Sequence, residues 1–282
     1  MSTKLGTLGF HLDGRPCAVG CSFCYLGVRP PAGDSSLDGE IAARIVRAAP
    51  ARDIAVAISE PAKRWRTGLT AVVEAARERG LPVAVTTTLD VVARDPWVVE
   101  GCTRLTLSLD PEKVPVLPSG VVPIRRRDPL DVAILAREVA AIARPDLEIV
   151  GLVSLASPEL CARLADGLLA DLLAVPGLAA IGLNGLKPPP PWCDKAFWLG
   201  LLARLGPLLK QHLGRRLHLD CYVNARLLGL GDCPAKPDVS AGREFRACVY
   251  QKDPDFVFQD ADDWAARTAG YEPPARCPFP IV

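Results

Sequence analysis

Three cysteines near the start of the chain, Cys17, Cys21 and Cys24, have a spacing that suits an iron-sulfur cluster. Three thiolates on one short loop can ligate three irons of a cubane cluster and leave the fourth iron without a protein ligand. An iron with an open position can bind a small molecule directly, as the metal of a catalytic zinc site does. The triplet therefore predicts a 4Fe-4S cluster that takes part in chemistry.

Other metal or redox sites match this triplet less closely. A structural zinc site usually has a second Cys pair or His residues at a distance, and the nearby imidazole is that of His11. A redox Cys-x2-Cys motif needs Cys21 and Cys24 and leaves Cys17 unexplained. A bacterial-ferredoxin run has closer spacing and a fourth Cys followed by Pro. A non-catalytic iron-sulfur or zinc protein is the alternative class of function.

The elements that must position the triplet alternate along the chain. Apolar, β-branched runs predict buried parallel strands at residues 5–11, 54–59, 82–88, 103–109, 147–153, 178–184 and 217–223. Amphipathic stretches predict helices at residues 38–49, 68–79, 129–143, 158–174 and 195–213. This order predicts an α/β fold, a partial (βα)6-type TIM-like barrel, in which the loops after the strands build the site.

The regular alternation stops near residue 229, where the chain becomes rich in Gly, Pro, Asp and Cys. We therefore expect the barrel to span residues 1–228 and a cysteine-containing C-terminal extension, residues 229–282, to cap it. A short helix is expected at residues 260–268.

Four late cysteines could ligate an auxiliary iron-sulfur cluster: Cys221, Cys233, Cys248 and Cys277. A free Cys is also often a small buried apolar residue, which is the alternative interpretation. Core packing is expected for Cys102 and Cys161, which lie at a strand start and on a helix.

The motif Cys-x3-Cys-x2-Cys, with Phe23 directly before its last cysteine, resembles the signature of the radical S-adenosylmethionine (SAM) superfamily. The segment Ile58-Ser59-Glu60-Pro61 follows the second predicted strand and resembles the family's Gly-Gly-Glu-Pro segment, with Ser59 in place of the second Gly. The resemblance implies that Ser59, Glu60 and Pro61 hold the SAM amino group, and that Phe23 packs near the adenine.

Polar residues at two further strand ends agree with this resemblance. Ser108 and Asp110 end the fourth strand and are similar to the polar pair that commonly holds the SAM ribose. Residues 86–88, three threonines, end the third strand, where family members often carry polar residues facing substrate or cofactor. Apart from the resemblance, Glu60 and Pro61 could cap a loop, and Ser108 and Asp110 could form a turn.

The resemblance implies an enzyme, an oxidoreductase or transferase, that uses a 4Fe-4S cluster and SAM. The reduced cluster would cleave SAM to methionine and a 5′-deoxyadenosyl radical, which would abstract hydrogen from a small-molecule or peptide substrate. Flavodoxin or ferredoxin would donate the electron. A radical SAM enzyme that modifies nucleic-acid bases is the alternative within the same family.

Composition limits the partners and the compartment. The 282 residues carry 33 Lys and Arg against 32 Asp and Glu, so no global field attracts the chain to nucleic acid or an anionic membrane. No apolar run approaches the length of about 18 residues that a membrane span needs. Ten cysteines in a chain of this length without a secretory signal point to metal ligation or core packing. A cytoplasmic protein is expected.

Overall fold

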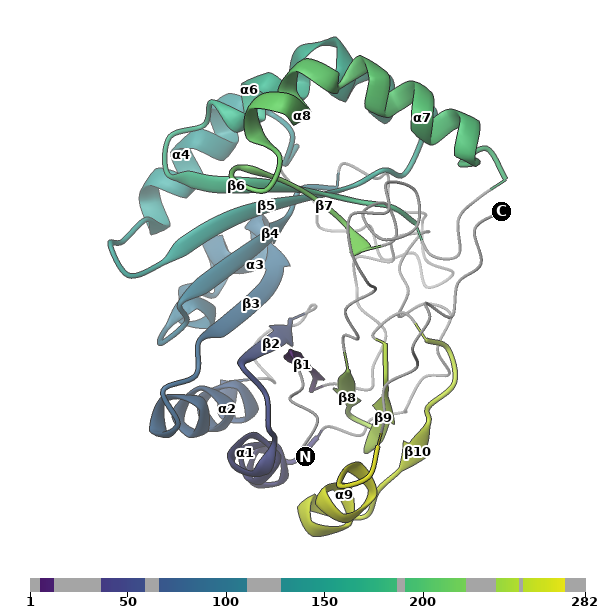
Figure 1. Cartoon of the computed structure of the whole chain (residues 1–282). Coiled ribbons are helices and arrows are strands. Elements are labelled where there is room, and N and C mark those ends of the chain that lie inside the picture. The colour runs from purple at the N-terminus through teal and green to yellow at the C-terminus, as the bar shows by residue number, and fades with distance from the viewer. Residues whose placement is uncertain are drawn as a thin grey trace, which may run out of the picture. The chain divides into compact units, whose positions relative to one another are not determined.

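The computed structural model describes residues 6–12, 37–58, 66–110, 128–186, 191–221, 237–248 and 251–271. In this part of the chain, strands and helices alternate in an α/β fold with mainly parallel strands (Figure 1). The chain divides into two compact units. The first comprises Met1–Leu105, Val114–Ile124 and Pro234–Ala275, and the second comprises Thr106–Lys113, Arg125–Cys233 and Arg276–Val282. The boundary predicted between residues 228 and 229 lies outside the described residues and stays a prediction.

The sheet of the first unit has the strand order β10-β9-β8-β1-β2-β3. Its parallel strands are β1 (Thr7–His11), β2 (Asp53–Ala57) and β3 (Val83–Thr88). On the other side of β1, β8 (Asp238–Ser240) is also parallel to it, and β9 (Glu244–Arg246) and β10 (Phe256–Val257) follow in antiparallel pairing. Part of the C-terminal segment therefore extends this sheet, which the sequence did not predict.

Alternation along these strands separates two faces. One face is mainly apolar and almost completely buried, and its side chains include Leu8, Phe10, Ile54, Val56, Val83 and Val85. The helices of this unit are α1 (Gly39–Ala48), α2 (Arg66–Glu78), α3 (Leu89–Arg94) and α9 (Ala261–Thr268), with a 3-10 helix at Pro96–Val99. The amphipathic helices cover apolar strands because both bury one face.

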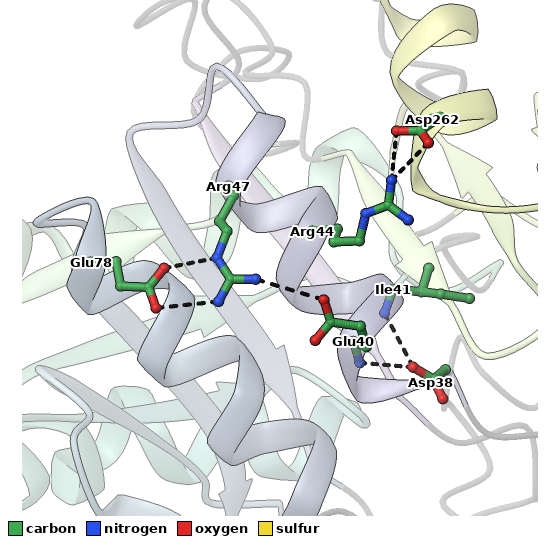
Figure 2. A network of polar contacts seen from close by, with 7 residues as sticks. All are labelled: Asp38, Glu40, Ile41, Arg44, Arg47, Glu78 and Asp262. Atoms are coloured by element: carbon green, nitrogen blue, oxygen red, sulfur yellow. Dashed lines mark hydrogen bonds and ion pairs between the residues drawn. The ribbon is translucent and has the colours of Figure 1, made fainter.

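Polar contacts on α1 connect it to its neighbours (Figure 2). The Asp38 carboxylate accepts hydrogen bonds from the backbone N–H groups of Glu40 and Ile41 and caps the helix start. Arg47 donates to both carboxylate oxygens of Glu78 on α2, at 2.8 and 3.2 Å. Arg44 pairs with Asp262 on α9 at 2.7 Å. These ion pairs are exposed, so they add little stability but favour one alignment of the three helices.

The second unit contains the parallel strands β5 (Glu148–Ser154), β6 (Leu178–Asn184) and β7 (Leu217–Leu219). β4 (Arg104–Ser108) begins in the first unit and ends in the second. The helices are α4 (Val132–Ile142), α5 (Pro158–Arg163), α6 (Leu169–Leu173), α7 (Lys195–Arg204) and α8 (Gly206–His212). A π-helical turn at Leu164–Leu168 joins α5 to α6, and Gly167 there has a φ of 132°, which a side chain would strain.

Packing in the second unit is close at Gly151 on β5. A Cβ atom at this position would lie 2.7 Å from side-chain atoms of both Ile181 and Leu109, nearer than a carbon atom can approach. The absence of a side chain therefore lets two large apolar residues from neighbouring segments meet over β5.

The predicted α/β fold with parallel strands is confirmed, and all seven predicted strands are present, six of them with shifted ends. The predicted helix at residues 158–174 contains the π-helical turn, and the one at 195–213 divides into α7 and α8 at Leu205. The short helix expected at residues 260–268 is α9. None of the helices in the described ranges is both long and apolar enough to cross a membrane.

Candidate functional site

Most of the predicted cluster and cofactor residues lie outside the described residues. These are Cys17, Cys21, Phe23, Cys24, Ser59, Glu60, Pro61, Cys233 and Cys277. The structure does describe the strand ends that precede them: β1 ends at His11, before the triplet, and Ile58 stands directly before Ser59. The Ile58 N–H donates to the carbonyl oxygen of Thr86 at 2.9 Å, which fixes the end of β2 against β3.

The face of the first unit's sheet opposite the buried apolar face, the open face, carries small residues in β1, β2 and β3. Register pairs Gly9 with Ala55 and Ala55 with Ala84, and it pairs Ala57 with Thr86. Paired residues share a face of a sheet, so these five positions form one surface, and all five are partly exposed. The small, partly exposed residues of β2 and β3 contrast with the buried apolar residues of the opposite face.

Two of the three threonines that end β3 make hydrogen bonds to the backbone, and the third lies on the open face. Thr87 is buried on the apolar face and donates its hydroxyl to the Ile58 carbonyl oxygen at 3.1 Å. Thr88 caps α3 by accepting a hydrogen bond from the N–H of Val91. Thr86 is the one of the three that lies beside Ala57 on the open face.

Ser108 and Asp110, the predicted ribose pair, belong to a compact hydrogen-bond cluster in the second unit. The Ser108 hydroxyl donates to Asp110 Oδ2 at 2.7 Å. Asp110 Oδ1 accepts from the backbone N–H of Ser154 at 2.7 Å, and Oδ2 accepts from the Ser154 hydroxyl at 3.2 Å. Only 4% of the Asp110 surface is exposed, and 5% of Ser154. The carboxylate therefore links the end of β4 to the end of β5.

Ser154 was not predicted as a site residue, although it directly follows the predicted fifth strand. Its part in the cluster depends on a cross-strand contact, and spacing along the chain does not reveal such contacts. Both Asp110 oxygens are occupied by these hydrogen bonds, whereas Ser108 is half-buried. The ribose role of the pair stays a prediction, and Ser108 is its more accessible member.

The polar edge continues along β6 and β7. Asn184 ends β6 and is in register with Ser154 on β5. After β7, the Asp220 N–H donates to the Leu183 carbonyl oxygen at 3.0 Å, and Asp220 Oδ2 accepts from the Gly185 N–H at 2.8 Å. Polar groups at successive carboxyl ends are typical of the catalytic edge of βα barrels.

The described late cysteines are buried thiols. Cys221, in the second unit, is 9% exposed, and Cys248, in the first, is 8% exposed. Within the described residues, no group of three or more His, Cys, Asp or Glu side chains could hold a metal ion. The predicted auxiliary cluster also needs Cys233 and Cys277, so it stays a prediction. Cys102 and Cys161 are buried in the core, as expected.

We expect Cys161 and Cys193 to resist thiol reagents in the folded protein. Burial raises the pKa of Cys161 to about 12 and that of Cys193 to about 11. At pH 8 only about one Cys161 thiol in ten thousand is ionised, and the thiolate is the reactive form. The contribution of the protonated Cys161 thiol to folding stability is fully present below its ordinary pKa of 9.0, and it is lost as the pH rises through about 12.

Iodoacetamide labelling at pH 8, with peptide mass spectrometry, measures this reactivity in the native protein and in urea. The urea-unfolded chain serves as the control for reagent and peptide recovery. Equal labelling rates for Cys161 in both states would contradict the prediction.

Comparison with known proteins gives fold similarity alone. No protein-family model and no curated protein matches the chain. Similar solved structures include BtrN in complex with AdoMet and 2-DOIA (8% identity over 96% of this chain and 85% of that one, TM-score 0.43). HMG-CoA lyase of Bacillus subtilis is 14% identical over 90% of this chain and 82% of that one, with a TM-score of 0.49. Dihydropteroate synthase (FolP) of Thermus thermophilus is 18% identical over 80% of this chain and 75% of that one, with a TM-score of 0.36. Similarity at this level assigns neither family nor activity.

Proposed function

We propose that this chain is a radical SAM enzyme, built on a partial (βα)6-type TIM-like barrel. The observation that carries the proposal is the position of the triplet Cys17, Cys21 and Cys24, which begins shortly after β1 ends at His11. In βα barrels the segments that follow the carboxyl ends of the strands build the active site. The motif and its place after the first strand of a parallel sheet support the same function.

The donor set of the triplet fits a site-differentiated cluster. Three cysteine thiolates supply three ligands, and the chain offers no fourth Cys at adjacent spacing. When bound, a 4Fe-4S cluster with SAM supplies reductive cleavage of the cofactor and a radical that abstracts hydrogen. The role of the thiolates is to hold the cluster and to leave one iron accessible.

The strand ends that precede the triplet and Glu60 in the chain support a cofactor site. Glu60 follows β2 closely, and we assign its carboxylate to the SAM amino group, with Ser59 and Pro61 beside it. The hydrogen bond from Ile58 to Thr86 holds the strand end from which this segment leaves. The side chains on the open face of β2 and β3 are small and partly exposed, and this supports a ligand site beside them.

The proposed substrate is a small molecule or a peptide. The nearly balanced charge of the chain gives no field that would favour a polyanion. An external one-electron donor, flavodoxin or ferredoxin, is part of the proposal because reductive cleavage consumes an electron. We assign the protein's own groups to binding and orienting the cofactor and to excluding water from the radical.

Electron paramagnetic resonance (EPR) of the reconstituted protein tests the proposal. After anaerobic reconstitution with iron and sulfide, we expect about four irons per chain, or about eight with an auxiliary cluster. Addition of SAM should change the EPR spectrum of the dithionite-reduced cluster, because SAM binds the open iron. If the EPR spectrum of the reduced cluster did not change on addition of SAM, the chain would be a non-catalytic iron-sulfur protein. If the chain bound zinc and no iron, the triplet would belong to a zinc site.

A further inference from the structure

Buried polar side chains gather beside the end of β1 in the first unit. Arg246 and Asp238 have no exposed surface, and His11 and Ser240 are 6% and 8% exposed. Charged groups are rarely buried to this extent in proteins unless they are paired or bound to a ligand. All four residues come from β1, β8 and β9.

The register of these strands brings the polar residues onto one face. β1 and β8 pair Gly9 with Asp238 and His11 with Ser240, and β8 and β9 pair Asp238 with Arg246. The same face carries Ala57, which is paired with His11 on the other side of β1. The polar group therefore adjoins the open small-residue face, at the carboxyl end of the strand that leads to the triplet.

The hairpin of β8 and β9 is held internally by Arg246. Its Nη1 donates to the Ser240 hydroxyl at 3.2 Å, and its Nη2 donates to Glu244 Oε2 at 2.7 Å. The guanidinium also contacts the Lys252 carbonyl oxygen at 3.3 and 3.4 Å. The Ser240 hydroxyl donates to the same Glu244 oxygen at 2.9 Å. These bonds make the hairpin a rigid support for Asp238.

Asp238 reaches from this support to the histidine. Its Oδ1 lies 3.3 Å from His11 Nε2. A Cβ on Gly9 would lie 3.2 Å from the same oxygen and 3.3 Å from the Pro237 carbonyl oxygen, so a side chain at that position would crowd the carboxylate. Gly9 thus leaves the space that Asp238 occupies, and the carboxylate lies close enough to attract the His11 ring and favour one orientation of it.

Stability alone does not account well for this pair. Desolvating a carboxylate and an imidazole is costly, and buried pairs can often be replaced by apolar residues with little loss of stability. A histidine held by a carboxylate is typical of sites where the ring must face a ligand in one orientation. The location at the carboxyl edge agrees with such a role.

We propose that the imidazole of His11 hydrogen-bonds SAM at the carboxyl end of β1, and that Asp238 is the positioning residue that orients this imidazole. The inference rests on the proposed function, because it assigns a further residue to the same cofactor. It also gives the C-terminal hairpin a role in the site, since β8 supplies the carboxylate.

Equilibrium dialysis of labelled SAM against the reconstituted protein tests the pair. We expect Asp238→Leu and His11→Leu each to raise the dissociation constant for SAM about tenfold, as loss of an orienting partner commonly does. The double Leu variant should bind no more weakly than either single variant, because both changes remove one interaction. Asp238→Asn, which keeps an acceptor oxygen, should restore most of the affinity.

Asp262→Leu is the matched control, because it makes the same Asp-to-Leu change in the same unit at an exposed ion pair. It should bind SAM like the unchanged protein. Iron content and thermal unfolding of every variant show whether the cluster and fold are retained. If Asp238→Leu does not fold, the double Leu variant gives the measurement of SAM affinity, and His11→Leu gives it if neither folds.

Unchanged SAM affinity in the folded Leu variants would overturn the role of His11 and Asp238 and leave the proposed function intact. Absence of SAM binding and of a SAM-dependent EPR change in the unchanged protein would instead reject the proposed function. Additive losses in the double variant would show two independent effects, and this result would also overturn the positioning role.

Discussion

Replacing Cys17, Cys21 and Cys24 together by Ala should abolish the SAM-dependent EPR change and reduce SAM cleavage by dithionite-reduced protein to the level of a protein-free control. The thiolates are the proposed ligands of three irons, and alanine offers no ligand in their place. Iron content should fall by about four per chain, which a colorimetric assay measures. Methionine and 5′-deoxyadenosine, quantified by chromatography, report cleavage without knowledge of the substrate.

Three buried cysteines provide the matched controls for this experiment. Cys102→Ala, Cys161→Ala and Cys193→Ala, made one at a time, should retain the iron and the SAM response, because these thiols lie in the core of the described structure. A SAM-dependent signal that survived in the triple variant would contradict the prediction. If about four irons remained without that signal, the late cysteines would be identified as the ligands of a second cluster.

Local pattern was sufficient to predict the repeating elements. The buried strands read as continuous apolar runs because neighbours on both sides and one packed face exclude water. The predicted run 178–184 is β6 in full, and residues 82–88 contain β3. Amphipathic spacing likewise predicted α1 and α2 within a few residues. Periodicity is a local property, so the sequence alone reveals it.

Strands that depend on distant partners were missed. β8 and β9 have three residues each, and β10 has two. Their sequences are polar or mixed, with Asp238 and Arg246 buried where a hydrophobic pattern would place apolar residues. These segments form strands because β1 offers an edge for pairing, and a pairing partner more than 200 residues away leaves no local signal.

The residues of the candidate site also differ in whether the sequence alone could suggest them. Spacing along the chain suggested the cysteine ligands and the polar pair Ser108 and Asp110, since the residues of each group are close in sequence. Spacing could not suggest Ser154 as the partner of Asp110 or Asp238 as the partner of His11, because these contacts join different strands. Sequence motifs therefore suggest candidate binding groups, and the fold shows which side chains lie against them.

Asp110→Ala should lower the free energy of unfolding by about 3 kcal/mol, within the range for loss of a buried network. The change removes the acceptor of the Ser154 N–H and of the Ser108 and Ser154 hydroxyls, in a site where only 4% of the Asp110 surface meets water. A buried donor left without an acceptor keeps its full desolvation cost. Urea unfolding followed by circular dichroism measures the change.

Ser108→Ala is the matched control for the Asp110 network. It removes one hydrogen bond and leaves both Ser154 contacts with Asp110, so we expect a loss of about 1 kcal/mol. SAM affinity separates the two roles of the pair: a ribose contact through Ser108 would weaken SAM binding in this stable variant. If Asp110→Ala unfolded at the same urea concentration as Ser108→Ala, the carboxylate would not be the link between β4 and β5, and its place in the site would have to be explained by ligand binding alone.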